Sequence, residues 1–257
     1  MKTRRFIPIL LAGAAAALFL PAAAQARALV DDPAAVAAIP ASAATYFAEC
    51  NAEYQAWLAG RAAERGASAL DAPWRILSTT SHKQIRNDYC VPATTTIMDH
   101  YLRGATTHWS QNRWAEYTYS GMPLWTDETG GNMWVMAMGL KNVTGSAYSY
   151  SSGNSTLSVY DRTEYGILQR GRPVAYGTRI IARDWPNYRL NHVGHIMAGR
   201  GFDWRAGVIY VDDPYPENAL PPLGYGATGG DTYGQKTYPR EIIAGGVLAS
   251  ASQQVVF

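Results

Sequence analysis

Cysteine is scarce in this sequence, since its 257 residues contain two, Cys50 and Cys90. Two thiols allow one disulfide bridge at most, so cross-links do not form the framework of this fold. A Cys50–Cys90 bridge remains open as an alternative. It would block any chemistry that needs a free Cys90 thiol.

Long apolar runs are also rare, and the clearest one spans residues 6–20. Basic residues precede it at positions 2, 4 and 5, and an A-x-A site follows it and ends at Ala26. This order is typical of a secretory signal peptide, and the run is short for a bilayer span of about 20 residues. We therefore expect residues 1–26 to be removed and the protein to be secreted, extracellular or periplasmic, with no membrane association afterwards. An uncleaved anchor helix is the alternative.

An excess of one charge is missing too. Lys and Arg number 22 against 20 Asp and Glu, and removal of three basic residues with residues 1–26 gives 19 − 20 = −1. This balance indicates no nucleic-acid partner. The remaining 257 − 26 = 231 residues suit one sizeable core and are short for two full domains. We expect an N-terminal helical extension over 27–71 and a main domain over 72–257.

The helical periodicity is clearest over residues 41–63, where apolar side chains recur at spacings of three and four. These positions are Phe47, Cys50, Tyr54, Trp57 and Leu58. A small buried hydrophobe is a sufficient account of Cys50. Because this helix precedes the chemical motifs, we expect it to pack on the outside of the fold.

The rest of the chain places helices before strands. We expect further helices over 91–103, 112–119, 158–169 and a segment capped by Thr126–Thr129 with apolar positions to Leu140. We expect strands over 173–181, 192–198 and 208–211, a turn through 201–204, and a last strand within 241–257. This order favours an α+β fold with a largely antiparallel sheet.

The stretch from Gln84 to Ala93 carries the main chemical signal. Pro92 fits the first turn of a helix, where a missing N–H costs nothing, and Gly104 suits the end of that helix. Cys90 would then lie at the helix N-terminus. Free backbone N–H groups and the helix dipole stabilise a thiolate at that position, which indicates a nucleophile.

A catalytic thiol needs a base, and the five histidines are the candidates. His82 lies in a predicted loop before Gln84, and His100 lies about 15 Å along the helix axis from Cys90. His108 lies in a loop without a visible orienting partner. His195, on a predicted strand beside Gly194, is the best candidate.

An orienting carboxylate for His195 is expected from Asp213, which ends the next strand. Asp212 would face the other way, and a turn-forming role is the alternative for Asp213 before Pro214. Because side chains alternate along a strand, His192 and His195 should point to opposite faces. This argues against a metal hydrolase built from His192, His195 and either aspartate.

This constellation resembles the papain-like cysteine peptidases, and most closely the bacteriocin-processing branch known as peptidase family thirty-nine. Four short motifs carry the resemblance: Gln84, Cys90 in Tyr-Cys-Val-Pro-Ala, Gly194-His195, and Val211-Asp212-Asp213-Pro214. The Gly171-Arg172-Pro173-Val174 turn also fits that branch. The resemblance implies a nucleophile at Cys90, a base at His195, an orienter at Asp213 and an oxyanion donor at Gln84. It implies a helical part that presents the cysteine and a sheet that presents His and Asp.

The chain departs from that family in two ways. Val91 follows the cysteine where the family usually has Gly, and the transporter fused to the peptidase proper is missing. An exported chain is therefore not expected to cleave double-glycine leaders on the cytoplasmic side.

We expect an exported thiol hydrolase that acts on a peptide or protein and uses no metal or other cofactor. The sequence does not indicate an oligomeric state. The alternative is an inactive exported binding or adhesion module, for which Val91 is the best argument. A serine hydrolase is less favoured, because no G-x-S-x-G is present.

Overall fold

A computed structural model describes residues 39–64, 73–124, 132–216, 232–251 and 253–257. The predicted signal peptide, residues 1–26, lies outside the described residues, as does the predicted cap at 126–129. Among the described residues, no helix combines the length and the apolar character needed to span a bilayer.

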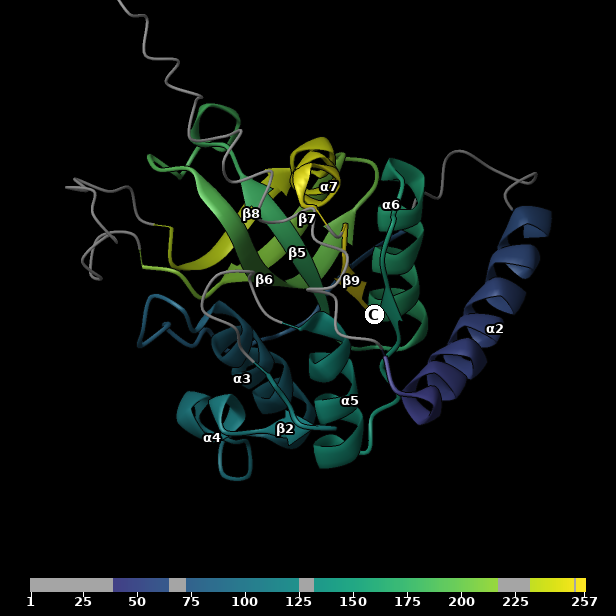
Figure 1. Cartoon of the computed structure of the whole chain (residues 1–257). Coiled ribbons are helices and arrows are strands. Elements are labelled where there is room, and N and C mark those ends of the chain that lie inside the picture. Colours follow the sequence, from purple (N-terminus) through teal and green to yellow (C-terminus); the bar gives the residue numbers. More distant parts are fainter. Residues whose placement is uncertain (1–38, 65–72, 125–131, 217–231, 252) are drawn as a thin grey trace, which may run out of the picture. The chain divides into compact units, whose positions relative to one another are not determined.

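The centre of the fold is a seven-stranded sheet whose paired strands are all antiparallel (Figure 1). Its main path runs β4-β9-β5-β6-β7-β8, and β1 pairs with β6. The strands are β1 Trp74–Ile76, β4 Tyr150–Ser151, β5 Val174–Ile180, β6 His192–Asp203, β7 Val208–Asp213, β8 Gly234–Pro239 and β9 Val255–Val256. A separate pair joins β2 Thr118–Tyr119 to β3 Met122–Pro123.

Helices cover the sheet on both faces. They are α2 Ala41–Glu64, α3 Cys90–Arg103, α4 Gln111–Ala115, α5 Met133–Thr144, α6 Thr156–Glu164 and α7 Arg240–Ala249, with a π-helical turn Tyr165–Gln169 and a 3-10 turn Ala182–Asp184. This mixture of helices and an antiparallel sheet confirms the predicted α+β fold class.

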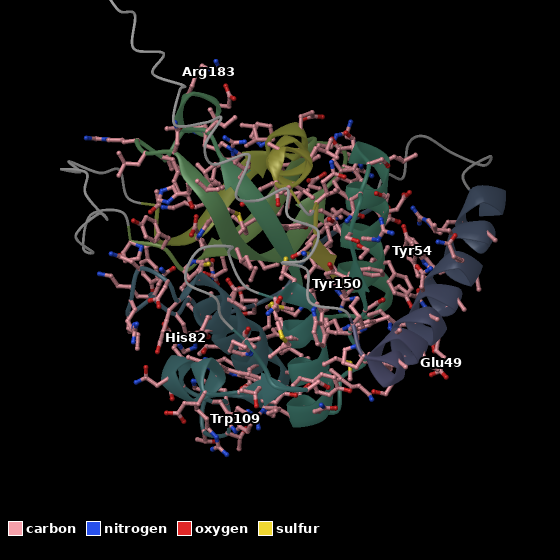
Figure 2. The ribbon with its side chains drawn as sticks, viewed as in Figure 1. Glu49, Tyr54, His82, Trp109, Tyr150 and Arg183 are labelled. Atoms are coloured by element: carbon pink, nitrogen blue, oxygen red, sulfur yellow. The ribbon has the colours of Figure 1, made fainter. Side chains whose placement is uncertain are left out.

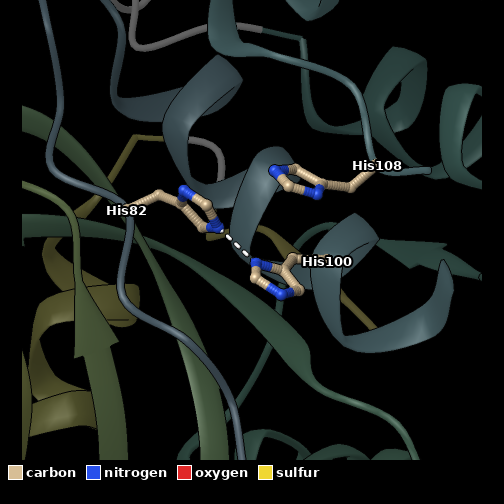
Figure 3. Close-up of side chains that lie close together, drawn as sticks. All are labelled: His82, His100 and His108. Carbon is tan, nitrogen blue, oxygen red and sulfur yellow. Dashed lines mark hydrogen bonds between the residues drawn. The ribbon is translucent and has the colours of Figure 1, made fainter. Parts of the chain in front are cut away.

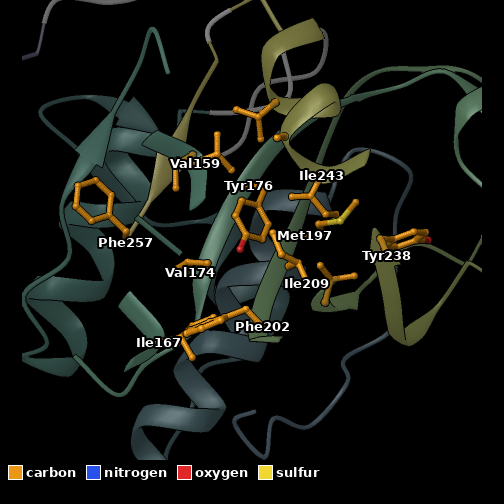
Figure 4. Close-up of a cluster of buried hydrophobic side chains, with 14 of the residues drawn as sticks. Val159, Ile167, Val174, Tyr176, Met197, Phe202, Ile209, Tyr238, Ile243 and Phe257 are labelled. Atoms are coloured by element: carbon orange, nitrogen blue, oxygen red, sulfur yellow. The ribbon is translucent and has the colours of Figure 1, made fainter. Parts of the chain in front are cut away.

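Alternation along the strands produces two cores, one on each face. On β6, Met197 joins a cluster with α6 and α7, and its neighbours Ile196 and Ala198 join a second cluster with α3 and α5. Figure 4 shows the first cluster, in which Tyr176 and Met197 meet Ile243 of α7. Both faces of the sheet are therefore apolar. His195, Asp212 and Asp213 on β6 and β7 are buried polar exceptions.

Helix α2 follows its predicted boundaries closely and buries Phe47, Cys50 and Tyr54. The Tyr54 ring packs edge-on against Tyr165 and Phe257, while Glu49 lies on the exposed side of the helix (Figure 2). As expected, this helix lies outside the sheet and contributes no side chain to the site described below.

A last strand lies within the predicted range 241–257 but is much shorter than that range, and the turn predicted at 201–204 is misplaced. Residues 240–249 form helix α7, and the last strand is confined to Val255–Val256. Ile243, Ala244 and Val247 are buried at helical spacing, which a short apolar run does not distinguish from a strand. The turn predicted at 201–204 also comes later, because β6 extends to Asp203.

Candidate functional site

Helix α3 begins at Cys90 itself. The preceding Tyr89 makes no side-chain cap, no acidic residue lies in the first turn, and Pro92 has no N–H to donate. The Ala93 N–H donates to the Tyr89 carbonyl at 2.9 Å. The positive end of the helix dipole therefore lies at Cys90, with no acidic side chain in the first turn to offset it.

Two threonine hydroxyls join the strand that carries His195 to its neighbours. Thr94 of α3 donates to the carbonyl of Ile196 at 2.9 Å. Thr178 of β5 donates to the carbonyl of His195 at 3.0 Å. Since Thr94 lies one helical turn after Cys90, these bonds fix the start of α3 against β6 beside His195.

His195 and Asp213 form a buried pair, as the sequence predicted. His195 Nε2 lies 2.9 Å from Asp213 Oδ1, and the two residues are 3% and 0% exposed. The Tyr188 hydroxyl donates to Asp213 Oδ2, and the Tyr215 backbone N–H donates to Oδ1 at 3.0 Å. With three donors around it, the carboxylate is held in one orientation and holds the imidazole in turn.

The environment of His195 favours its charged form. Burial alone would lower the pKa of His195, but the Asp213 charge and hydrogen bond outweigh it, and the Cys90 thiol adds a hydrogen bond and a Coulombic interaction. Together they raise the pKa of His195 to about 10. The structure therefore brings Cys90, His195 and Asp213 into one chain of contacts suited to a thiolate–imidazolium pair.

The alternation argument about His192 is wrong. The register shifts between the Thr178–His195 and Ile180–His192 pairs, so β6 carries one extra residue there. This bulge turns both rings to the same side, where their centroids are 6.2 Å apart and both approach Tyr215.

The metal alternative at this place is disfavoured on another ground. The His195 ring is already engaged by Asp213 and by Cys90. In the part of the chain that the structure describes, the residues close enough to share an ion are a different set. Burial, followed by the charge of His195, lowers the pKa of His192 to about 4.

Asp212 faces away from His195, as expected from strand alternation. Its Oδ2 accepts a hydrogen bond from the Thr79 hydroxyl at 2.9 Å. Burial raises the pKa of Asp212, against the lowering effect of hydrogen bonds from Ser81 and Thr79. Of the two aspartates, only Asp213 is in reach of His195.

Gln84 is buried just before the nucleophile helix, at 2% exposure. Its backbone N–H donates to the Pro214 carbonyl at 2.8 Å, next to Asp213. Its side-chain Nε2 donates to the carbonyls of Arg86 and Asn87 at 2.6 and 2.8 Å. In this conformation both amide hydrogens hold the loop that leads into Cys90, and a role as oxyanion donor stays a prediction.

Val91 and Cys50 are both packed into the interior of the fold. Val91 is 1% exposed and belongs to the cluster beneath α3 and α5, so its branched side chain is used by the core. Cys50 and Cys90 are both free thiols in this structure. Burial raises the pKa of the Cys50 thiol, which makes it a poor nucleophile.

Residues 76–221 match the sequence pattern of the peptidase C39-like family. The match covers 221 − 76 + 1 = 146 of 257 residues, more than half of the chain, and includes all four predicted site residues. This chain belongs to the peptidase C39-like family. The family assignment confirms the resemblance read from the short motifs around Gln84, Cys90, His195 and Asp213.

A solved structure from Bacillus anthracis, provisionally described as a C39-like peptidase, is similar to this C39-like chain at 14% identity and a TM-score of 0.45. The similarity covers 72% of this chain and 96% of that one. No curated protein matches the chain.

Three supporting residues of the C39-like site were missed from the sequence. Tyr188 comes from the loop before β6, Tyr215 acts through its backbone N–H, and Thr94 lies inside α3. Thr94 alone carried a signal, because a threonine on the buried side of a helix needs a hydrogen-bond partner. Nothing in the local sequence indicates the other two.

Proposed function

We propose that this C39-like chain is an exported thiol hydrolase that cleaves peptide or amide bonds. Cys90 is the nucleophile, His195 the general base and acid, and Asp213 the group that orients His195. The chain of contacts from Cys90 through His195 to Asp213 at the start of α3 is the observation that supports this proposal.

The proposed reaction is acyl transfer in two steps. The Cys90 thiolate forms a bond to the carbonyl carbon, the C–N bond breaks, and the leaving amine takes the proton of His195. Water then attacks the thioester, giving a proton to His195, and the acid leaves as the Cys90 thiolate is restored. Asp213 stabilises the imidazolium throughout without itself taking the proton.

The oxyanion would be stabilised by the Cys90 backbone N–H and by Gln84. A donor of this kind is worth about 3 kcal/mol in related chemistry. Because both hydrogens of the Gln84 amide already donate to Arg86 and Asn87, one of them must turn to the substrate when it binds. Substrate binding would then be coupled to movement of the 85–89 loop.

A peptide-library digest tests the proposal, with the Cys90→Ala variant as the comparison. We expect the wild-type chain to cleave peptides and Cys90→Ala to lose at least about 10⁴-fold in rate. Cys50→Ala is the matched control, because it removes a buried thiol that takes no part in the proposed mechanism. This variant should cleave peptides as wild type does. Equal cleavage by wild type and Cys90→Ala would overturn the proposal.

A second candidate function is an exported binding module that retains the fold without turnover. The observation in its favour is burial of the site, since Cys90 is 8% and His195 3% exposed. Iodoacetamide labelling distinguishes the two functions, with the modified cysteine identified by mass spectrometry. Faster labelling of Cys90 than of Cys50 near neutral pH favours the hydrolase, whereas a folded chain whose Cys90 resists labelling favours the binding module.

Export is tested separately from chemistry. Expression of the full chain in a secreting bacterial host should give a mature protein that begins at Arg27 in the periplasm or medium. Intact-mass measurement checks this cleavage site, and retention of residues 1–26 in a membrane fraction would contradict it.

A further inference from the structure

Three histidines that the proposed mechanism does not use lie together at the far end of α3. His82 comes from the loop after β1, His100 from the last turn of α3, and His108 from the following loop. Figure 3 shows the three rings turned towards one another, with His82 Nε2 lying 2.6 Å from His100 Nδ1. The ring centroids are 4.4 to 5.0 Å apart.

The His108 ring is oriented by a backbone carbonyl four residues earlier in the chain. His108 Nδ1 lies 3.2 Å from the Gly104 carbonyl oxygen. A carbonyl only accepts, so Nδ1 carries the proton and Nε2 carries the lone pair. Metal-binding histidines in proteins are typically fixed in this way, through the ring nitrogen that does not bind the ion.

Buried polar contacts hold the His108 loop against α3. The Asp99 carboxylate, fully buried beside His100, accepts the Trp109 backbone N–H at 2.7 Å and the Trp114 indole N–H at 3.1 Å. Arg103 donates to the same carboxylate at 2.6 Å. With its oxygens used in this way, Asp99 is a support of the cluster and not one of its ligands.

The third ring is held from α4. Gln111, the first residue of that helix, donates from Nε2 to the Lys83 carbonyl at 2.6 Å and accepts the Ile85 N–H at 3.1 Å. His82 adjoins Lys83, so its position is set by a buried side chain from another segment. The three rings are therefore brought together by the fold and are not the chance neighbours of one mobile loop.

We propose that His82, His100 and His108 bind one divalent transition-metal ion of the zinc class. One ligand atom from each residue lies within 4.8 Å of the others. Tetrahedral zinc with bonds of about 2.0–2.1 Å places two nitrogens about 3.3 Å apart, so the rings would rotate out of their stacked arrangement and draw their nitrogens together on binding. Three imidazoles and no carboxylate select zinc, copper or nickel over calcium and magnesium.

Binding would replace the hydrogen bond between His82 and His100, and the proton of that bond would move to the other nitrogen of the ring that donates it, so that each neutral ring keeps one N–H. The remaining coordination position is left for water, since three protein ligands is the usual number in open zinc sites.

The ion would lie about 15 Å along α3 from Cys90, ten residues away, and is separate from the proposed hydrolysis. Its role would be to fasten the loop of His82, which leads through Gln84 into Cys90, to the end of α3. The metal proposal does not depend on peptidase activity.

The test uses the full mature chain carrying Cys90→Ala, so that a reactive thiolate does not compete for zinc. We expect one zinc per chain after desalting, measured by plasma mass spectrometry, and displacement of a chromophoric chelator at micromolar zinc. His108→Ala should weaken binding at least about 100-fold, because even outer-shell partners of a metal are worth about 10–100-fold. Thermal unfolding should shift upward with zinc only when the three histidines are present.

His192→Ala is the matched control, since it removes a half-buried histidine outside the cluster and should retain the zinc. Circular dichroism checks that each variant is folded, and His82→Gln replaces His108→Ala if the latter is not. The proposal is overturned if the parent chain retains no zinc, if the cluster variants retain it as the parent does, or if only His192→Ala loses it.

Discussion

Helix α3 has a histidine group at each end, and the two groups are opposites. At its first residue, Cys90 meets His195, whose imidazole is paired with the Asp213 carboxylate. In its last turn, His100 meets His82 and His108, and the nearby Asp99 carboxylate is taken by Arg103 and two tryptophan N–H groups. His195 is buried and the three histidines of the second group are half-buried, so burial, which lowers the pKa of a histidine, acts more strongly on His195.

The two groups differ in the partner of the nearby carboxylate. Asp213 is bonded to the histidine itself, whereas Asp99 is bonded to Arg103 and to two tryptophans. The Asp213 carboxylate raises the pKa of His195 to about 10 against the effect of burial, whereas burial and the neighbouring His100 and His108 rings lower the pKa of His82 to about 4. A charged imidazole suits proton transfer beside a thiolate, and neutral imidazoles suit metal binding. Histidines at the two ends of α3 are thus suited to two different kinds of chemistry because of their neighbours.

Replacing Asp213 by Asn should have the largest effect at the first group. The amide no longer stabilises the imidazolium and favours the wrong tautomer, so kcat for a cleaved peptide should fall by about 10⁴-fold. Tyr188→Phe, which removes one donor and keeps the carboxylate, should cost far less. Zinc binding at the His82 cluster should not change in Asp213→Asn, and full activity of that variant would remove the comparison.

Asp99→Asn should lower the stability of the fold around the second histidine group. Asp99 is fully buried and accepts hydrogen bonds from Arg103, from the Trp109 backbone N–H and from the Trp114 indole N–H. A neutral amide weakens these bonds, so urea unfolding should show a free energy of unfolding lower by about 2–3 kcal/mol. Asp184→Asn is the control, because its ion pair with Arg183 is exposed and should contribute nothing measurable. Equal stability of the two variants would contradict the role given to Asp99.

On the alkaline side, the pH dependence of stability should report on the first group, through His195. Because folding raises the pKa of His195 from 6.5 to about 10, its contribution is fully present below pH 6.5 and is lost as the pH rises towards 10. Removing the thiol in Cys90→Ala lowers that folded pKa, so the loss should be complete at a lower pH. Thermal unfolding between pH 6 and 10 measures this, and superimposable curves for the two proteins would be the contrary result.

The smallest effect is expected on the acid side, from the second group. Folding lowers the pKa of His82 from 6.5 to about 4, so the unfolded chain takes up a proton first and stability falls as the pH drops below 6.5. The full shift would correspond to a larger loss, but the ring is half-exposed and solvent screens part of the effect. In chelator, His82→Gln should therefore lose on the order of 1 kcal/mol less stability than wild type between pH 7 and 5. Urea midpoints at the two pH values check this, and a steeper fall in the variant would refute it.

The sequence was a good guide to what local pattern controls. The start of α3 at Cys90, the strands carrying His195 and Asp213, and the α+β class all follow from capping, periodicity and turn residues. These features depend on neighbours within a few residues, so one sequence contains the information.

The errors share a different cause, since each depends on contacts that the local pattern does not contain. The bulge in β6 reverses the side expected for His192 relative to His195. The grouping of His82, His100 and His108 follows no fixed spacing and is set by Asp99 and Gln111. Residues 240–249 form helix α7 and not a strand because their apolar side chains pack against the sheet from one face of the helix.

The hydrogen bond from Thr94 to Ile196 spans 102 positions of the chain, and it has a consequence for the order of folding. Contacts so distant in sequence form late, because closing the intervening chain costs entropy before any contact repays it. Until β6 docks on α3, Cys90 has neither the imidazole nor the fixed helix end beside it. The thiol would thus remain unreactive while the chain is being made, and its nucleophilicity would arise in the last step of assembly.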